Sequence, residues 1–440
     1  MQWLSISVFS IALSIAGYGI YKSISRIRKN ILLGREEDRK DQPALRWKNM
    51  LLLALGQKKM FKKPVPALLH LFVYAGFLIV NMEMLEIVID GLTGHHRIFA
   101  PVLGAFYPFM INVFEFFALA VIIACSTFLI RRYILKVKRF NGAEMTSWPK
   151  LDATYILLIE IALMFAFLKM NAADQVLQSR GVEHYIPTGT FYVSSLWMPI
   201  FDQFSTPFLI ISERAAWWFH ILGVMFFANY VFYNSKHLHI FMAFINTYFA
   251  KLKPVGELSS MPEVTKEVKI MLNLPVEESS EAAPPARFGA KDVTDLSWVN
   301  ILNAYSCTEC GRCTQQCPAN ITGKKLSPRK IMMDTRDRAE ELGKFIAKEG
   351  AGKEDGKALI GDYISDEELL ACTTCNACVE ACPVGIDPVD IIIKLRQYKL
   401  MELSQAPGSW NSMLSNIENN FAPWKFSPAD RFNWAEKLNS

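Results

Sequence analysis

Two cysteine runs of identical spacing constrain this chain of 440 residues more than any other feature. One is Cys307-x2-Cys310-x2-Cys313-x3-Cys317-Pro318, and the other is Cys372-x2-Cys375-x2-Cys378-x3-Cys382-Pro383. This spacing is typical of paired [4Fe-4S] clusters, in which three close thiolates bind one cube and the fourth, before proline, binds the other. The sequence therefore predicts one cluster on Cys307, Cys310, Cys313 and Cys382, and a second on Cys372, Cys375, Cys378 and Cys317.

A single Cys-x2-Cys pair would also fit a zinc site or a redox-active dithiol. Eight cysteines in two matching runs favour the clusters instead. A cluster carries one electron at a time and performs no substrate chemistry by itself, so this region is expected to conduct electrons. Because reduced thiols bind metals in the cytoplasm, where disulfides are rare, we place the cysteine-rich half there. The ninth cysteine, Cys125, lies in an apolar run and is expected to be a small core residue.

The composition of the chain is that of a membrane protein. Hydrophobic residues make up 51% of it, aromatic residues 12%, and the mean hydropathy is +0.18, above the values of ordinary soluble proteins. The apolar residues are concentrated in positions 1–250, whereas positions 251–440 are polar and hold all eight clustered cysteines. A helix needs about 20 residues to cross a bilayer. Five stretches come close to this length: Trp3–Tyr21, Pro64–Asp90, Phe106–Ile130, Asp152–Met170 and Pro207–Ser235.

Basic residues predict the direction of these spans. The segment between the first and second spans carries 13 Lys or Arg, and positions 131–150 carry six more. The two other connections carry one each, Arg97 and Arg180, so the positive-inside rule places them outside the membrane. The amino terminus is then outside and the polar half is in the cytoplasm. Because basic residues follow the first apolar run and none precedes it, this run is expected to remain as an anchor.

Histidines are few, and three of them lie where a membrane-embedded cofactor would need them. His70 lies about 9 Å along its span from the cytoplasmic boundary, and His237 and His239 lie at the cytoplasmic end of the last span. Two neutral imidazoles from facing helices commonly hold the iron of haem b. We predict such a haem between the second and fifth spans, near the clusters. The alternatives are a satisfied core histidine at position 70 and lipid-headgroup contacts at positions 237 and 239.

A second, outer haem is an open alternative centred on His220. This residue precedes His239 by nineteen positions, which is about 28 Å along one helix. The second span offers no histidine at that depth, so the partner would be His95 or His96 from the outer loop. The tryptophans at positions 217 and 218 are more typical of an aromatic belt at the membrane interface.

Acidic residues in the outer half of the spans form a further candidate site. Their positions are Glu83, Glu86, Asp90, Glu115 and Glu213. Carboxylates inside a membrane often mark proton paths, and the oxidation of a quinol releases protons. We therefore expect a quinone pocket in this region, with Glu83 or Glu86 as the proton acceptor. Solvated helix ends and an ion pair with Arg214 are the plainer alternative.

The membrane half resembles the cytochrome b subunits of respiratory nitrate reductase and of membrane heterodisulfide reductase. The likeness rests on five spans with the amino terminus outside, on His70 in Ala-Leu-Leu-His-Leu-Phe, and on Ser-Lys-His-Leu-His-Ile from Ser235. It implies that His70 and His239, rather than His237, are the ligands of the inner haem. It also implies an outer-haem histidine at a position that Val80 occupies in this chain.

The cysteine-rich half is similar to heterodisulfide-reductase-type iron-sulfur oxidoreductases and to their small ferredoxin subunit. Phe-Gly-Ala-Lys-Asp-Val from Phe288, Leu-Ser-Trp from Leu296 and the first cysteine run carry this likeness. Such proteins often contain a catalytic CCG module, and this chain has no adjacent cysteine pair. The resemblance therefore implies that the terminal substrate chemistry takes place on another polypeptide, a cytoplasmic heterodisulfide reductase-like (CCG-type) subunit or another oxidoreductase subunit.

These patterns divide the chain into four regions. Residues 1–250 are expected to form the five-span domain, 251–296 a cytoplasmic linker, 297–403 the two-cluster ferredoxin domain and 404–440 a tail. The acidic, proline-rich segment 275–285 is expected to be a tether that lets the ferredoxin head dock without rigid fusion. Helices expected at Ser327–Phe345 and Asp366–Ala371, each near a Ser or Asp cap, favour an all-helical ferredoxin over a βαβ one. The tail is expected to pack on its own domain or, alternatively, to dock a partner.

The fold class expected is all-α, a five-helix transmembrane cytochrome b bundle followed by an α-helical dicluster ferredoxin domain. The function expected is electron transfer at the cytoplasmic (inner) membrane between the quinone pool, haem b, two [4Fe-4S] clusters and a partner oxidoreductase. The alternative is a haem-free anchor in the membrane lipid that attaches a ferredoxin module to a larger complex. The net charge of +5 is explained by membrane topology, and no motif indicates nucleic-acid binding.

Overall fold

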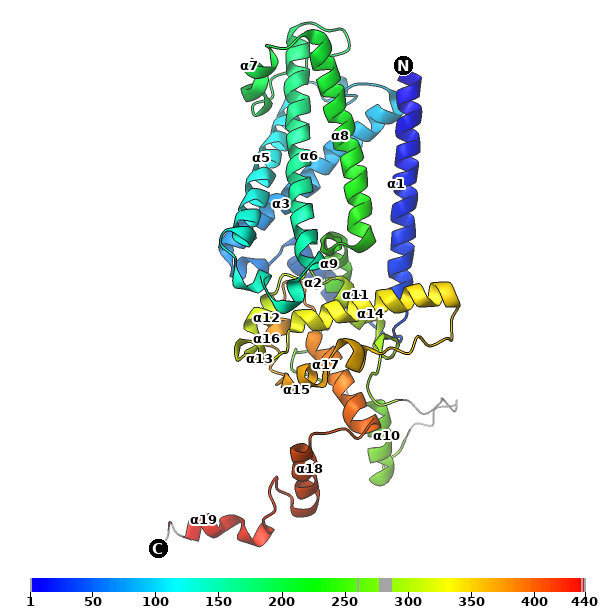
Figure 1. The fold of residues 1–440 in the computed structure, drawn as a ribbon, viewed down its shortest axis with the longest axis vertical. Coiled ribbons are helices and arrows are strands. Elements are labelled where there is room, and N and C mark those ends of the chain that lie inside the picture. The colour runs from blue at the N-terminus through cyan, green and yellow to red at the C-terminus, as the bar shows by residue number, and fades with distance from the viewer. Residues whose placement is uncertain (1, 259–260, 277–286, 437, 439–440) are drawn as a thin grey trace.

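The computed structural model describes the chain except for residues 1, 259–260, 277–286, 437 and 439–440 (Figure 1). The described residues form helices joined by loops, with two isolated β-bridges, Arg35 to Ser297 and Ile360 to Ile364, and no strand among them. The all-α prediction is therefore confirmed. Most of the predicted tether 275–285 falls outside the described residues.

Five helices are long and apolar enough to cross a membrane. They are α1 (Gln2–Ile31), α3 (Pro64–Thr93), α5 (Phe106–Tyr133), α6 (Trp148–Ser179) and α8 (Thr206–Asn234). Each corresponds to one of the five predicted spans. Their lengths of 28 to 32 residues exceed the about 20 that a bilayer requires, so each helix is long enough to extend past the hydrocarbon layer.

Four of these helices form a bundle, and α1 lies along it (Figure 1). α3 packs on α5, α5 on α6 and α6 on α8, while α1 contacts both α3 and α8. Large apolar side chains such as Phe114 and Phe167 fill the interior and are fully buried. Cys125 is buried in the same core, as predicted. α1 approaches the bundle through Phe9, whose ring lies so close to Gly91 of α3 that any larger residue there would collide with it.

Short elements close both ends of the bundle. At the base, where the ferredoxin domain attaches, lie α2 (Pro43–Met50), η1 (Leu51–Leu55), η2 (Met60–Lys62), η3 (Lys138–Phe140), η4 (Ala143–Met145), η6 (Lys236–Leu238) and α9 (His239–Tyr248). At the opposite, distal end lie α4 (Ala100–Leu103), η5 (Ser194–Trp197) and α7 (Met198–Phe201). α9 packs on α2 and η1, which holds the segment containing His237 and His239 beneath the bundle.

The ferredoxin domain consists of short helices around two cysteine loops and one long helix. In chain order these are η7 (Val293–Asp295), α11 (Trp298–Tyr305), α12 (Arg312–Gln316), α13 (Pro318–Ile321), α14 (Pro328–Glu349), η8 (Leu359–Tyr363), α15 (Asp366–Ala371), α16 (Ala377–Ala381), α17 (Pro388–Gln397) and η9 (Tyr398–Glu402). The two helices predicted in this domain are α14 and α15. Ser327 caps α14 by accepting a hydrogen bond from the amide of Lys330, and Ser365 forms a capping box with Glu368 at α15, as their residue types favour.

The ferredoxin domain packs directly against the base of the bundle (Figure 1). The end of α1 contacts α11 and α14, where the Asn30 amide donates to the Tyr305 hydroxyl at 2.9 Å. α9 contacts α11, where Asn303 donates to Asn246 at 3.0 Å and Asn246 donates to the carbonyl of Val384 at 2.8 Å. All of these side chains are buried. The two domains therefore share one interior, in contrast to the flexibly tethered head that we expected.

Two further segments extend away from this assembly (Figure 1). α10 (Pro262–Met271) lies in the linker, and α18 (Gly408–Asn420), η10 (Pro428–Phe432) and α19 (Asn433–Glu436) form the tail. None of the described residues of α18 or α19 is buried, and Trp424 and Trp434 are exposed. The expectation that the tail packs on its own domain is therefore wrong.

Candidate functional site

The two cysteine loops adopt the same backbone conformation although their other residues differ. The residue before the second cysteine of each run is left-handed, with φ 53° at Glu309 and 52° at Thr374. The residue after that cysteine is left-handed too, with φ 71° at Gly311 and 60° at Asn376. A short helix then begins in each loop, α12 in the first and α16 in the second. The repeat in sequence is thus also a repeat in structure.

The structure brings the clustered cysteines together in two groups. Cys307, Cys310, Cys313 and Cys382 line one small cavity, of about 20 Å³, together with Cys378. Cys317 lies within electrostatic range of Cys372 and Cys378. Among the described residues no three metal-ligating side chains meet at the spacing of a single ion, and the sulfurs stand around a space instead. The assignment of individual cysteines to the two clusters stays a prediction.

Burial and hydrogen bonding shape the chemistry of these sulfurs. Burial, together with neighbouring thiols, raises the pKa of Cys307 to about 12 and that of Cys382 to about 11. Such a thiol stays protonated by itself, and metal binding is what converts it to a thiolate. The backbone amide of Thr374 donates to Cys372 Sγ at 3.4 Å, and that of Ile386 donates to Cys382 Sγ at 3.3 Å. Hydrogen bonds of this kind tune the reduction potential of a cluster.

A cavity of about 320 Å³ lies between the base of the bundle and the first cysteine loop. Side chains from α3, α5, α6, η6 and α9 form most of its wall, and Thr308, Glu309, Cys310 and Arg312 close it on the ferredoxin side. Its volume is within the range of small-molecule and cofactor sites. A cysteine of the first loop therefore borders the same space as the histidines of the membrane domain.

His70 of α3 and His239 of α9 face each other at this cavity. Their ring centres are 6.3 Å apart, and the ring planes are inclined by 42°. The Nδ1 of His70 is hydrogen-bonded to Gln57 Oε1 at 3.1 Å, and the Nδ1 of His239 to the carbonyl of Lys236 at 2.9 Å. An oxygen acceptor at Nδ1 fixes the tautomer with its proton there and leaves Nε2 free to bind a metal.

The separation of the two rings suits a metal between them. Two metal–nitrogen bonds of about 2 Å, plus about 1 Å from each nitrogen to its ring centre, give about 6 Å between trans imidazoles. Four basic side chains, Arg132, Arg139, Lys236 and Arg312, line the same cavity. Such cations suit the two carboxylate groups of haem b. The donor set therefore fits haem b, with two opposed imidazoles, an apolar wall and positive charges at its edge.

His237 lies at the same cavity, but its ring has other neighbours. Its Nε2 is 3.9 Å from a carboxylate oxygen of Glu160, and its ring centre is 5.4 Å from that of Phe227. Burial lowers the pKa of His237 to about 3 and also lowers that of His239. Both imidazoles are therefore neutral at physiological pH, which is the state that binds metals.

His220 is deeply buried, and its Nδ1 has no hydrogen-bond partner among the described residues. Its ring centre lies 6.2 Å from that of Phe167. The expected partners are placed elsewhere, because His95 is exposed and His96 Nε2 lies 3.3 Å from a carboxylate oxygen of Asp174. In the described part of the chain, no ring contact or hydrogen bond joins His220 to either histidine. The structure therefore does not assemble a histidine pair for an outer haem.

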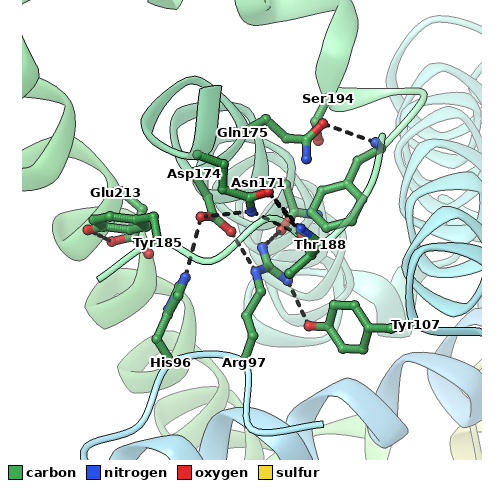
Figure 2. A network of polar contacts seen from close by, with 12 residues as sticks. His96, Arg97, Tyr107, Asn171, Asp174, Gln175, Tyr185, Thr188, Ser194 and Glu213 are labelled. Carbon is green, nitrogen blue, oxygen red and sulfur yellow. Dashed lines mark hydrogen bonds and ion pairs between the residues drawn. The ribbon is translucent and has the colours of Figure 1, made fainter. Parts of the chain in front are cut away.

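A network of buried polar side chains fills the distal end of the bundle (Figure 2). The Arg97 guanidinium donates to Asp174 at 2.5 Å, to Asn171 at 2.8 Å and to the Tyr107 hydroxyl at 3.0 Å. That hydroxyl donates in turn to Glu86 at 2.8 Å. Burial alone would lower the pKa of Arg97, but Asp174 beside it raises that pKa well above its usual range. The network is thus centred on a permanent positive charge.

The five acidic residues of the outer spans, Glu83, Glu86, Asp90, Glu115 and Glu213, are all buried. Burial excludes the alternative of solvated helix ends, although the expected ion pair between Glu213 and Arg214 is present. Backbone amides donate to Glu86, Asp90 and Glu115. Glu83 differs, because its Oε2 has no hydrogen-bond partner among the described residues. A charged carboxylate without a partner is costly at such a place, so Glu83 is suited to hold a proton or to contact a ligand.

Gln57 and Glu309 belong to the cavity although no sequence pattern singled them out. Gln57 lies in a loop before η2, and no spacing rule connects it with His70. Glu309 gave a visible signal, because it is an acidic residue between two cluster cysteines where the second run has Thr374. A negative charge beside an electron carrier needs a compensating partner, and this requirement would have pointed to a contact outside the loop.

Comparison with known proteins decides the nature of the cysteine loops. Residues 306–386 match the family described as 4Fe-4S dicluster domain. These residues are a [4Fe-4S] dicluster domain. The expected likeness to heterodisulfide reductases is also confirmed, because a small subunit of the ferredoxin/F(420)H(2)-dependent CoB-CoM heterodisulfide reductase of Methanosarcina acetivorans is 34% identical over 23% of this chain and 49% of its own length.

Two longer relatives align with nearly the whole chain. The probable iron-sulfur-binding oxidoreductase FadF of Bacillus subtilis is 28% identical over 97% of this chain, and the EtfAB:quinone oxidoreductase of Syntrophomonas wolfei is 27% identical over 99% of it. This chain spans 60% of the length of each of them. No solved structure matches the chain. The protein is therefore an iron-sulfur electron-transfer protein related to oxidoreductase complexes, with five helices that associate it with a membrane.

Proposed function

We propose that the protein is the electron-transfer subunit of a quinone-linked oxidoreductase in the cytoplasmic membrane. Electrons pass between the quinone pool and a cytoplasmic partner oxidoreductase, by way of haem b in the bundle and the two clusters beneath it. The name of the Syntrophomonas wolfei relative, EtfAB:quinone oxidoreductase, supports the quinone. The partner is proposed to be a heterodisulfide reductase-like or other oxidoreductase subunit, which supplies the substrate chemistry.

One observation carries the haem, namely the facing imidazoles of His70 and His239. Each ring is oriented by an acceptor at Nδ1, and their centres are 6.3 Å apart. When bound, haem b supplies a one-electron carrier next to the first cluster loop. The chain holds its iron with the two imidazoles, offers cations to its carboxylates and excludes water with apolar side chains. The contact of His237 with Glu160 supports His239 as the second ligand.

An absorption spectrum of the purified full-length protein tests the haem. We expect the dithionite-reduced wild type to show the α-band of a b-type haem, and His70→Ala and His239→Ala to lose it while keeping their iron-sulfur content. His237→Ala should keep the band. His184→Ala, which changes an exposed histidine at the distal end, is the matched control. A wild type with full cluster content and no haem band would establish the rival function, a haem-free anchor for a ferredoxin module.

The quinone headgroup is proposed to bind beside Glu83, in the distal half of the bundle. The unpartnered Oε2 of Glu83 supports this place, and Glu86 and Asp90 continue the same helix face toward the distal end. Oxidation of a quinol yields a quinone, two electrons and two protons, and the electrons leave one at a time. Glu83 is proposed to accept the protons and to pass them toward Glu86. In the reverse direction the same groups return them.

Two substitutions test the quinone site. Glu83→Gln and Glu86→Gln should slow the reduction of the clusters by a short-chain naphthoquinol at least tenfold, because a neutral amide does not accept the released proton. Reduction by dithionite should be unchanged in both variants. Glu183→Gln, an exposed acid at the distal end, is the control. Unchanged rates of quinol-dependent reduction in both variants would place the quinone elsewhere.

The ferredoxin domain is proposed to lie in the cytoplasm and the distal end outside the membrane. The structure supports this orientation, because the two segments rich in Lys and Arg both lie at the base, beside the ferredoxin domain (Figure 1). The two basic residues of the distal connections are each held by a carboxylate, Arg97 by Asp174 and Arg180 by Asp202. The positive-inside rule then gives a single answer for all of the connections.

A further inference from the structure

A buried ionic bridge joins the histidine segment of the cavity to the first cluster loop. The Lys236 ammonium lies 2.5 Å from Glu309 Oε2, and the Arg336 guanidinium of α14 lies 2.9 Å from Glu309 Oε1. The carbonyl of Lys236 is also the acceptor for His239 Nδ1. Glu309 stands between Cys307 and Cys310 in the loop. The residue that orients one histidine of the cavity is thus the residue that binds the cluster loop.

The bridge is shielded from solvent and anchored at both ends. The side chains of Lys236 and Glu309 are 9% and 3% exposed. On the membrane side, Asp152 of α6 accepts hydrogen bonds from the Ser235 hydroxyl at 2.8 Å and from the backbone amide of Lys236 at 2.9 Å. Ion pairs in such a place are much less screened than ion pairs on the surface. The segment that carries His239 is therefore fixed to α6, to the cluster loop and to α14.

The second cluster loop shows that cluster binding does not itself require this carboxylate. Thr374 takes the place of Glu309 with nearly the same backbone angle, φ 52° against 53°, and it is exposed. The turn around a cluster needs a left-handed residue at this point, and Glu has no advantage over Thr in that conformation. The presence of Glu at position 309 is therefore explained by the contacts of its side chain.

The bridge lies where the two candidate redox sites approach each other. Lys236, Glu309, Cys310 and His239 all line the cavity of about 320 Å³. None of the cysteines of the second loop is among the described residues that line it. An electron that moves between the cavity and the clusters therefore crosses at the first loop, and its rate depends on how closely this loop is held.

We infer that Glu309 is a positioning residue for electron transfer, which with Lys236 holds the first cluster loop at a fixed distance from the histidine-lined cavity. This inference rests on the proposed function, since it needs a redox cofactor in the cavity. In the step concerned, one electron leaves one centre and arrives at the other, and no bond forms or breaks. Because electron tunnelling slows steeply with distance, a loosened loop slows this step without changing either cofactor.

The test compares full-length Glu309→Thr, which copies the second loop, with Lys236→Met and with the double variant. A water-soluble ruthenium photosensitiser reduces the clusters in a laser flash, and the haem band reports the arrival of the electron. We expect the transfer to be at least tenfold slower in each single variant, and the double variant to be no slower than the singles, as for two residues of one interaction. Thr374→Ala, at the equivalent place of the second loop, should stay within twofold of the wild type.

A second measurement separates positioning from cluster assembly. Iron and sulfide content should equal those of the wild type in every variant. The midpoint potential of the first cluster should rise in Glu309→Thr, which removes a negative charge beside it, and fall in Lys236→Met, which removes a positive one. An unchanged transfer rate in Glu309→Thr, or the loss of its first cluster, would overturn the inference. A wild type without haem would overturn the proposed function instead.

Discussion

At the scale of single residues, the chemistry of the cavity depends on which nitrogen of each imidazole is free. The carbonyl of Lys236 orients His239, and a backbone group of this kind is insensitive to mutation. His70 depends on a side chain, because its Nδ1 is bound by Gln57. The two rings are thus oriented by acceptors of different kinds, and only one of these acceptors is accessible to substitution.

Gln57→Leu is expected to weaken haem binding about 10- to 100-fold, the usual cost of losing the outer partner of a metal-bound histidine. The ring of His70 would lose the acceptor that keeps its proton at Nδ1 and its Nε2 free. The measurement is a haem titration of the haem-depleted protein, followed by its absorption. Gln203→Leu, an exposed glutamine at the distal end, is the control. Equal affinities in both variants would show that Gln57 does not orient His70.

Arg97→Met is expected to lower the free energy of unfolding by about 3–5 kcal/mol, because Asp174 would be left buried without its partner. Unfolding in detergent, followed by circular dichroism, measures the change. Lys353→Met removes an exposed ion pair with Glu349 and should cost at most about 1 kcal/mol. A similar loss in both variants would contradict the role of Arg97 as the centre of the distal network.

Sequence reasoning reached those residues of the site that local spacing marks. The cysteine runs predicted the dicluster domain, and the depths of His70 and His239 in their spans predicted the pair that the structure brings together. It missed Gln57 and the bridge from Lys236 to Glu309, because partners separated by 73 positions share no periodicity. It also allowed the acidic residues of the outer spans to be solvated, since depth along one helix does not reveal which side chains of other helices surround it.

At the scale of elements, the start of α14 joins the ferredoxin domain to the membrane domain. Two residues after its cap, Arg329 donates to Glu144 at 2.7 Å and to the carbonyl of Arg139 at 2.7 Å. The cap residue Ser327 donates to the same carboxylate at 2.6 Å. One helix end thus holds the loop between α5 and α6. Because Arg139 also lines the cavity, this contact supports the wall of the haem site as well.

Acid is expected to weaken this contact through Glu144. Burial alone would raise the pKa of Glu144, but the hydrogen bond from Ser327 and the charge of Arg329 lower it below its usual range. A carboxylate with a lowered pKa adds stability above its unfolded pKa and loses it as the pH falls through its folded pKa. Below about pH 4.3 the difference in melting temperature between wild type and Glu144→Gln should therefore shrink. A difference that is constant from pH 7 to pH 3 would contradict this role.

The elements themselves were largely predictable, and their contacts were not. Apolar length predicted all five spans, and Ser or Asp caps predicted α14 and α15. The tether and the tail were judged from composition, which says nothing about which surface receives them. α1 illustrates the limit, because its sequence predicts a helix in lipid, yet its last turn binds the ferredoxin domain through Asn30. A polar residue at a helix end is equally compatible with water and with a partner domain.

At the scale of the whole molecule, every strongly basic connection lies at one end of the bundle. This asymmetry predicts which positions a membrane-impermeant reagent reaches. In spheroplasts of a strain that expresses the full chain, Glu183→Cys at the distal end should react with a maleimide that does not cross the membrane. Lys353→Cys in the ferredoxin domain should react only after the cells are opened. Both positions are exposed in the structure, and the reverse pattern would invert the orientation.

The crossover of the fourth cysteines makes the order of the two clusters testable. Cys382 belongs to the second run but lies with Cys307, Cys310 and Cys313, next to the histidine-lined cavity. Cys382→Ser should therefore disrupt the cluster nearest the membrane, so that quinol still reduces the haem but no electron reaches the remaining cluster. Cys317→Ser should disrupt the other cluster and leave the nearer one reducible by quinol.

Freeze-quench electron paramagnetic resonance after mixing with quinol distinguishes the two variants. Without the crossover each run would hold its own cube, and the outcomes would be exchanged, because Cys317 would then serve the cluster beside the cavity. The result bears on the whole molecule, since a crossover ties the two loops into one folding unit. Each cluster then stabilises the loop that carries the other, and the insert that contains α14 is held between them against the base of the bundle.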